Sequence, residues 1–175
     1  LADPGFAGFI AAQLAAHGVP PSALIVEITE SAVMADPELA MGQLQELCEL
    51  GVKLSIDDYG TGYSSMAQLK RLPVHELKID KSFVLDLLSN PDDDIIVRST
   101  IELGHNMGLK IVAEGVETEA ILDRLDQLGC DIAQGYLLSK PLPPAAFASW
   151  LENCQWHLPA ATTEGAARQP RPPGN

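Results

Sequence analysis

Apolar residues along the chain gather into five short runs of strand length, and the segments between the runs place their apolar positions at helical spacing. The runs predict strands over residues 24–28, 52–57, 77–80, 109–113 and 131–134. Helices are expected between Asp3 and Gly18, Asp36 and Gly51, Asn90 and Gly108, and before Gly129, with shorter ones through Met66 and around Trp150. Strands that alternate with helices in this way predict a parallel sheet with helical crossovers, and hence an α/β fold.

Polar residues recur where the predicted strands end. The strand-end residues are Glu27, the pair Asp57 and Asp58, Asp80, Glu114 and Gln134. Because the carboxyl ends of parallel strands meet at one edge or rim, these side chains form a ring of oxygen ligands. An open sheet gathers ligands mainly at its switch point, so the recurrence on consecutive strands favours a closed barrel.

The segment 55–65 carries two adjacent acids and then two glycines, Gly60 and Gly62. Neighbouring side chains on a strand point to opposite faces, so Asp57 and Asp58 reach one site only if the chain leaves strand geometry there. Such a pair requires a nearby cation or a proton. A solvated turn that caps the next helix is the alternative for an isolated pair of acids. The acids on the other strands favour a site.

The composition describes a globular but strongly acidic chain. Its 175 residues are 46% hydrophobic, and 24 acidic against 11 basic residues give a formal charge of -13. A protein that binds a nucleic-acid polymer needs a basic surface, which this charge argues against. A phosphorylated ligand would have to be held by metal ions or by a few placed basic residues.

Cysteine and histidine do not suggest a metal site. Cys48, Cys130 and Cys154 are far apart and lack metal-ligand spacing, so we expect reduced thiols in a cytoplasmic protein, with Cys48 in the core. The four histidines do not cluster. No apolar run approaches the roughly 20 residues that span a membrane. The composition from residue 157 to residue 175 predicts a disordered tail, and the start at Leu1 suggests a piece of a longer chain.

Carboxylates without clustered histidines or thiolates favour the hard cations Mg²⁺ or Mn²⁺. Glu27, Asp57, Asp58 and Glu114 would be enough to hold two ions about 4 Å apart, as in phosphoester hydrolysis.

Three further charged residues are candidates for the site, and two of them have a second interpretation. Lys78 lies on the same strand face as Asp80, where it could hold an attacking water or form a salt bridge to Asp80 or Asp57. Glu30 and Glu117 each lie three residues beyond a strand-end glutamate and could fix the loop from Gly60 to Ser65. Glu30 could instead belong to a helix that starts beside Ser31.

Five motifs in order resemble those of the EAL domain family. They are Glu27-Ile28-Thr29-Glu30-Ser31, Asp57-Asp58-Tyr59-Gly60-Thr61-Gly62-Tyr63-Ser64-Ser65, Leu77-Lys78-Ile79-Asp80-Lys81-Ser82-Phe83-Val84, Val112-Ala113-Glu114-Gly115-Val116-Glu117-Thr118, and Gln134-Gly135-Tyr136 with Lys140-Pro141-Leu142-Pro143. The resemblance extends from Leu1 to about Leu151. It implies a (β/α)8 TIM-type barrel that hydrolyses cyclic di-GMP to linear pGpG with Mg²⁺ or Mn²⁺ in a two-metal site.

The resemblance also implies a role for each matching residue. Metal ligands are Glu27, Asp57, Asp58 and Glu114, catalytic residues are Lys78 and Glu114, substrate-binding residues are Asp80 and Gln134, and loop-stabilising residues are Glu30 and Glu117. It further suggests a homodimer through the Gly60 to Ser65 region and an upstream sensory or diguanylate cyclase domain.

The chain departs from the family pattern at its start. The Glu-Ala-Leu motif and the following asparagine motif are absent, so we expect residues 1–156 to form a partial domain that lacks about the first two strands. Two metal ligands then have no counterpart, and we expect impaired hydrolysis from this chain alone. Sheet edges at 24–28 and beside Gln134 would be open to pairing or aggregation.

Two other functions compete with that of a phosphodiesterase. A catalytically inactive EAL-type module would bind cyclic di-GMP or a protein partner without turnover, but it would not need all five of Glu27, Asp57, Asp58, Lys78 and Glu114. A different two-metal barrel enzyme acting on a small carboxylic acid would explain the acids but not the five motifs.

Overall fold

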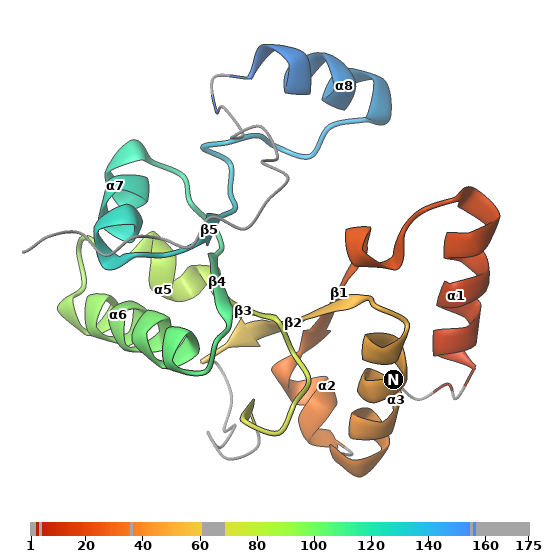
Figure 1. The fold of residues 1–175 in the computed structure, drawn as a ribbon. Helices are drawn as coiled ribbons and strands as arrows, with labels where there is room; N and C mark the ends of the chain where they lie inside the picture. The colour runs from red at the N-terminus through yellow and green to blue at the C-terminus, as the bar shows by residue number, and fades with distance from the viewer. Residues whose placement is uncertain (1–2, 4, 36, 61–68, 155, 157–175) are drawn as a thin grey trace, which may run out of the picture. The chain divides into compact units, whose positions relative to one another are not determined.

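The computed structural model describes residues 3, 5–35, 37–60, 69–154 and 156 (Figure 1). The chain forms two compact units, residues 1–140 and 141–175, and the strands all lie in the first. The predictions of a short helix through Met66, of a dimer contact at residues 60–65 and of a tail at residues 157–175 fall wholly or mostly outside the described residues. None of the helices that the structure describes is long and apolar enough to cross a membrane.

Within the described residues, five parallel strands form one sheet in the order β1-β2-β3-β4-β5. They are β1 (Ile25–Thr29), β2 (Lys53–Tyr59), β3 (Glu76–Ile79), β4 (Lys110–Ala113) and β5 (Ile132–Ala133). Each strand pairs with the next one along the chain, as the alternation of strands and helices predicts. The predicted parallel α/β architecture is therefore confirmed, although the fifth strand is shorter than expected.

Helices follow the strands in the first unit. They are α1 (Phe6–His17), the 3-10 turn η1 (Pro21–Ala23), α2 (Glu30–Ala35), α3 (Pro37–Glu49), α5 (Lys81–Leu85), α6 (Pro91–Asn106) and α7 (Glu119–Leu128). The side chains of Asn90 and Thr118 cap α6 and α7 by accepting backbone N–H bonds. Gly18 and Gly129 end α1 and α7 in the left-handed conformation. The second unit contains α8 (Pro144–Asn153), which confirms the helix predicted around Trp150.

Two details of the helices differ from the sequence prediction. The first helix begins at Phe6, because the Asp3 carboxylate accepts a hydrogen bond from the N–H of Gly5 ahead of the helix. The helix α5 was not predicted, and α2 was expected only as the alternative interpretation of Glu30; they have 5 and 6 residues. Segments of so few residues are too short to show a helical period in the sequence.

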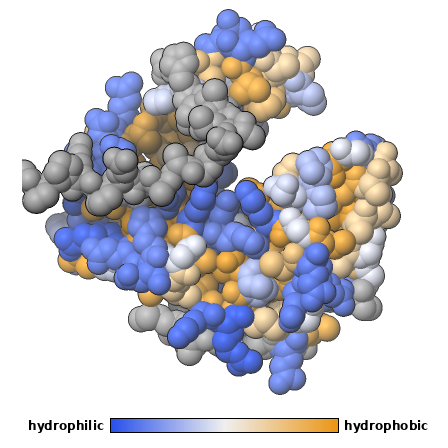
Figure 2. All heavy atoms as spheres, in the orientation of Figure 1, coloured by the Kyte–Doolittle hydropathy of each residue, from blue (hydrophilic) through white to orange (hydrophobic). Residues whose placement is uncertain are grey.

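The two faces of the sheet differ in polarity. Leu54 and Ile56 on β2 and Leu77 and Ile79 on β3 are at most 2% exposed, and they belong to the core that includes residues of α3 and α6. The intervening positions carry polar side chains, among them Ser55 and Asp57. Each apolar side chain buried in this way contributes about 1.5–3 kcal/mol, which fixes the polar face on the other side. The outer side of α6, at the lower left of Figure 2, presents mostly hydrophilic residues.

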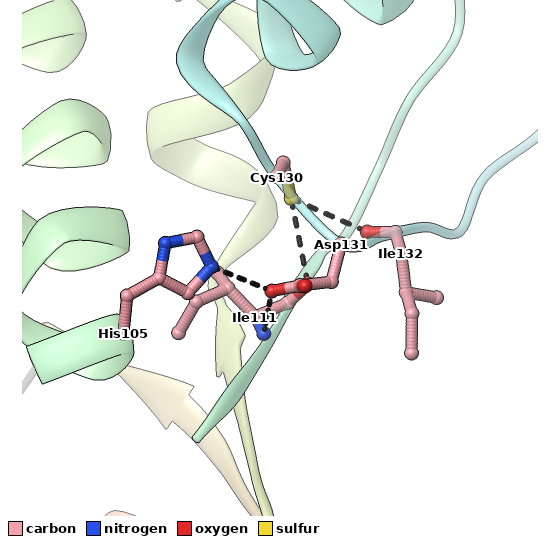
Figure 3. A network of polar contacts seen from close by, with 5 residues as sticks. All are labelled: His105, Ile111, Cys130, Asp131 and Ile132. Atoms are coloured by element: carbon pink, nitrogen blue, oxygen red, sulfur yellow. Dashed lines mark hydrogen bonds and ion pairs between the residues drawn. The ribbon is translucent and has the colours of Figure 1, made fainter. Parts of the chain in front are cut away.

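A polar network joins β5 to β4 and α6 (Figure 3). The Oδ2 atom of Asp131 accepts a hydrogen bond from the N–H of Ile111 at 2.9 Å and lies 2.8 Å from Nε2 of His105. Burial alone would raise the pKa of Asp131, but the hydrogen bonds from Ile111 and His105 outweigh it and hold this pKa below its usual value. The Cys130 thiol donates to the carbonyls of Ile111 and Ile132. These contacts add to the backbone pairing of the two-residue strand β5 with β4.

A bidentate ion pair joins α6 to α7. The Nε atom of Arg124 donates to Oδ1 of Asp94 at 2.8 Å, and a terminal nitrogen donates to Oδ2 at 3.0 Å. The planar guanidinium matches both carboxylate oxygens, so the pair fixes the two helices in orientation as well as distance.

Candidate active site

A buried lysine lies among three carboxylates on the polar face of the sheet. Lys78 on β3 is 3% exposed, and its Nζ atom lies 2.8 Å from Glu27, 3.1 Å from Asp57 and 2.6 Å from Glu114. These partners come from β1, from β2 and from the residue after β4. Of the two salt-bridge partners that the sequence suggested for Lys78, the structure shows Asp57.

The backbone leaves regular strand geometry at the paired acids. Asp58 has φ of 57°, a left-handed conformation that is uncommon outside glycine. The register between β2 and β3 shifts between Ile56 and Tyr59. The shift lets two neighbouring side chains reach one site, as the sequence argument requires. Carboxylate oxygens of Asp57, Asp58 and Glu114 all lie within 4.8 Å of one another, and we call these three residues the acid cluster.

The charges of this site are unbalanced. Burial raises the pKa of Asp58, and the charges of Asp57 and Asp80 together with a hydrogen bond to Asp80 raise it further. Burial alone would lower the pKa of Lys78, but hydrogen bonds to Glu114, Glu27 and Asp57 outweigh it and hold this pKa well above its usual value. One ammonium thus faces several carboxylates, which leaves an excess of negative charge.

The acid cluster suits a hard divalent cation. Its donors are all carboxylate oxygens, the ligands that Mg²⁺ and Mn²⁺ prefer. Glu27 contacts Lys78, but its side chain is 49% exposed and it lies outside the cluster. The structure therefore brings three of the four predicted metal ligands together. The fourth, Glu27, contacts Lys78.

The two residues predicted to bind substrate differ in their surroundings. Asp80 is the N-cap of α5, and its carboxylate accepts from both the N–H and the hydroxyl of Ser82. Burial would raise the pKa of Asp80, but these bonds and the charge of Lys81 lower it overall. Gln134 directly follows β5 and is exposed, and its N–H donates to the carbonyl of Ala113 at 2.8 Å.

Glu30 fits both of its predicted interpretations. It is the first residue of α2, and its Oε2 atom accepts a hydrogen bond from the N–H of Gly60 at 3.3 Å. Burial raises the pKa of the neighbouring Tyr59, and the charge of Glu30 adds to the increase. Glu117 is exposed, and within the described part of the chain it forms no hydrogen bond or ion pair. Glu117 was predicted to fix the loop from Gly60 to Ser65. Most of this loop falls within residues 61–68, which lie outside the described residues.

The sequence profile of the EAL domain matches residues 1–141. The chain belongs to the EAL domain family. Among relatives of this EAL domain, the bifunctional diguanylate cyclase/cyclic di-GMP phosphodiesterase MucR of Pseudomonas aeruginosa is 48% identical over 81% of the chain and 21% of MucR. The cyclic di-GMP phosphodiesterase NbdA of the same species is 47% identical over 73% of the chain and 16% of NbdA. The chain thus spans about a fifth of these relatives.

Solved EAL structures share the fold of this domain. The EAL domain of Mycobacterium smegmatis DcpA matches with a TM-score of 0.81 and 46% identity, over 87% of this chain and 68% of that one. The MucR phosphodiesterase in complex with cyclic di-GMP matches with a TM-score of 0.80 and 46% identity, over 83% of this chain and 59% of that one. A complex of Klebsiella pneumoniae BlrP1 with manganese and cyclic di-GMP matches with a TM-score of 0.75 and 33% identity, over 80% of this chain and 36% of that one. The TIM-type barrel fold class is therefore confirmed.

Sequence reasoning overlooked two polar residues of this EAL domain. Ser55 and Glu76 are 1% and 7% exposed and sit two residues before Asp57 and Lys78 on the same strands. Side chains two positions apart share a strand face, so counting back from the acids would have found them. The hydroxyl of Ser55 has no hydrogen-bond partner among the described residues.

Proposed function

We propose that this EAL domain hydrolyses cyclic di-GMP to linear pGpG with Mg²⁺ or Mn²⁺. The observation that carries the proposal is the convergence of Asp57, Asp58 and Glu114 beside the buried Lys78. The names of MucR and NbdA, and the manganese complex of BlrP1, support the same substrate and a divalent metal.

Each residue has a role in this proposal. Asp57, Asp58 and Glu114 would hold the cations, and Glu27 would join them by leaving Lys78. A bound divalent cation would lower the pKa of a water and neutralise the phosphate. Lys78 can only donate hydrogen bonds, so it orients the attacking water or binds the charge that develops on phosphate. Water adds its oxygen to phosphorus, the P–O3′ bond breaks, and a proton passes to the departing 3′ oxygen.

The remaining predicted residues act on substrate and loop. Asp80 and Gln134 flank the acid cluster along the strand ends and would contact the nucleotide. Glu30 holds the backbone of Gly60, and Glu117 would help to hold the segment 60–65. The hydrogen bond from Gly60 supports the role of Glu30.

We also propose a wider context. MucR is named as a bifunctional protein, and this domain matches 21% of its length. This comparison supports an upstream sensory or diguanylate cyclase domain. A homodimer through residues 60–65 and a location in the cytoplasm complete the proposal, and cross-linking at residues 60–65 would test the dimer.

The test is hydrolysis of cyclic di-GMP in Mg²⁺ or Mn²⁺. Because the chain covers 59% of the solved MucR phosphodiesterase chain, the assay compares the chain itself with a chimera that carries residues 1–141 in place of the matching MucR segment. We expect linear pGpG from the chimera and its loss in the Glu114→Gln chimera. Tight nucleotide binding without turnover by a folded chimera would contradict the enzyme and favour a cyclic di-GMP receptor.

A further inference from the structure

Three segments meet edge to edge where the strands end. They are residues 79–81 after β3, residues 114–116 after β4 and residues 134–137 after β5. The middle segment carries Glu114 of the acid cluster, so its placement decides where that carboxylate lies.

Backbone hydrogen bonds fix the middle segment from both sides. The N–H of Glu114 donates to the carbonyl of Ile79 at 3.2 Å. The N–H of Val116 donates to the carbonyl of Gln134, and the N–H of Leu137 donates to the carbonyl of Val116, both at 3.0 Å. Val116 is 0% exposed. Such bonds leave no room for a side chain between the segments.

Gly115 makes the first close approach. Its φ of +72° is a left-handed conformation, and a Cβ atom there would lie 2.6 Å from Cβ and 3.3 Å from Cα of Lys81. Side-chain carbon atoms do not approach so closely, so any larger residue would push the segment away from residues 79–81.

Gly135 makes the second close approach. A Cβ atom on Gly135 would overlap the backbone nitrogen and oxygen of Val116 and lie 2.7 Å from its carbonyl carbon. Backbone atoms cannot rotate away as the end of a side chain can. A side chain at this position would therefore displace residues 114–116 or residues 134–137.

We propose that Gly115 and Gly135 are positioning residues of the metal site. Their missing side chains let the three segments stack at backbone distance, which holds the Glu114 carboxylate beside Lys78 and within the acid cluster. The inference rests on the proposed function, because it concerns the same cation site. The two glycines touch no reacting atom and act through Glu114.

The experiment measures Mn²⁺ binding to the full chain by the paramagnetic resonance signal of free Mn²⁺. Gly115→Ala and Gly135→Ala are expected to weaken binding roughly 10- to 100-fold, the range for changes behind metal ligands. All variants are compared at a temperature where circular dichroism shows them folded.

Two matched variants separate positioning from general strain. Gly108 has φ of +77° and open space around its Cβ position, so Gly108→Ala introduces left-handed strain alone. A Cβ atom on Gly104 would overlap the side chain of Ile111 behind the sheet, so Gly104→Ala introduces crowding away from the acid cluster. Both are expected to lower the melting temperature and to retain wild-type Mn²⁺ affinity.

A rescue variant keeps the test decisive if Gly135→Ala does not fold. Lys81→Gly removes the Cβ atom that would lie 2.6 Å from the new methyl group in Gly115→Ala. The double variant Gly115→Ala/Lys81→Gly is expected to bind Mn²⁺ within about threefold of the Lys81→Gly single variant, because the segments can again approach.

The outcomes distinguish the inference from the proposed function. Wild-type affinity in Gly115→Ala and Gly135→Ala, with weak binding in Glu114→Gln, would overturn the positioning role and leave the metal site intact. An equal loss of affinity in all four glycine variants would also overturn it. If the wild-type chain binds no Mn²⁺, both the cation site and the inference fail.

Discussion

The Nζ atom of Lys78 lies 2.6 Å from an Oε1 atom of Glu114 and is at the same time within 3.1 Å of Asp57. One buried ammonium therefore holds together carboxylates from two strands on either side of its own. Without Lys78, no positive charge in this group of side chains would offset the carboxylates of the acid cluster.

Replacing Lys78 by Met keeps the apolar stem of the side chain and removes its charge. We expect the free energy of unfolding to fall by about 1–3 kcal/mol, because charged hydrogen-bond acceptors lose their buried donor. Urea unfolding with and without Mg²⁺ measures the change. Mg²⁺ should stabilise Lys78→Met more than it stabilises the wild-type chain, and equal stabilisation would contradict the proposed cation site.

Asp131 predicts a loss of stability in acid. Its folded pKa lies below the unfolded value of about 3.9, so its contribution is complete above that value and disappears as pH falls through the folded pKa. We expect Asp131→Asn to lower the free energy of unfolding by about 1 kcal/mol at pH 7, with the difference from wild type shrinking as pH falls below the unfolded pKa. Thermal unfolding at a series of pH values measures this difference. Asp126→Asn, at an exposed position of α7, is the matched control and should change the free energy of unfolding at pH 7 by less than about 0.5 kcal/mol.

The ion pair between Asp94 and Arg124 predicts a measurable coupling between α6 and α7. A double-mutant cycle of Asp94→Asn and Arg124→Gln should give about 0.5–1 kcal/mol, because both side chains are partly exposed. The coupling should shrink in 1 M salt, where charges are screened. A coupling of zero at low salt would show that the two helices are held by packing alone.

The Cys130 thiol predicts slow chemical modification. Burial raises its pKa, with opposing contributions from its hydrogen bonds, so at pH 8 it carries less thiolate than an ordinary cysteine. We expect iodoacetamide to alkylate Cys130 at least tenfold more slowly than it alkylates an unstructured cysteine peptide, with the rate rising as pH increases. Peptide mapping by mass spectrometry measures the rate, and labelling as fast as that of the peptide would contradict the partly buried placement of Cys130.

The sequence predicts where strands end far better than how the backbone behaves there. The strand-end positions of Glu27, Asp57 and Glu114 follow from apolar runs that stop at acids, and in the structure all three carboxylates lie within 3.1 Å of Nζ of Lys78. The left-handed Asp58 could be expected only as a condition for convergence, because no residue type at this position requires it. Its conformation comes from the pairing of β2 with β3, which is a long-range contact.

Other features could not be predicted because they depend on distant partners. The length of β5 is set by the few residues that pair with β4, and apolar runs cannot reveal this. The exposure of Glu27 depends on which chain segments cover the edge of β1. The sequence of β1 alone does not show which segments these are. The close approach of Gly135 to Val116 could not be predicted either, because a glycine at this position is also typical of an ordinary loop.

The strand order β1-β2-β3-β4-β5 has a consequence for how the site comes into being during folding. Because each strand pairs with its sequence neighbour, the sheet can grow one strand at a time as the chain leaves the ribosome. Asp57 meets Lys78 once β3 has joined β2, whereas Glu114 arrives only after β4 has joined. The proposed cation site is therefore completed late in the assembly of the sheet, and fraying of β4 would take it apart while the earlier strands are still paired.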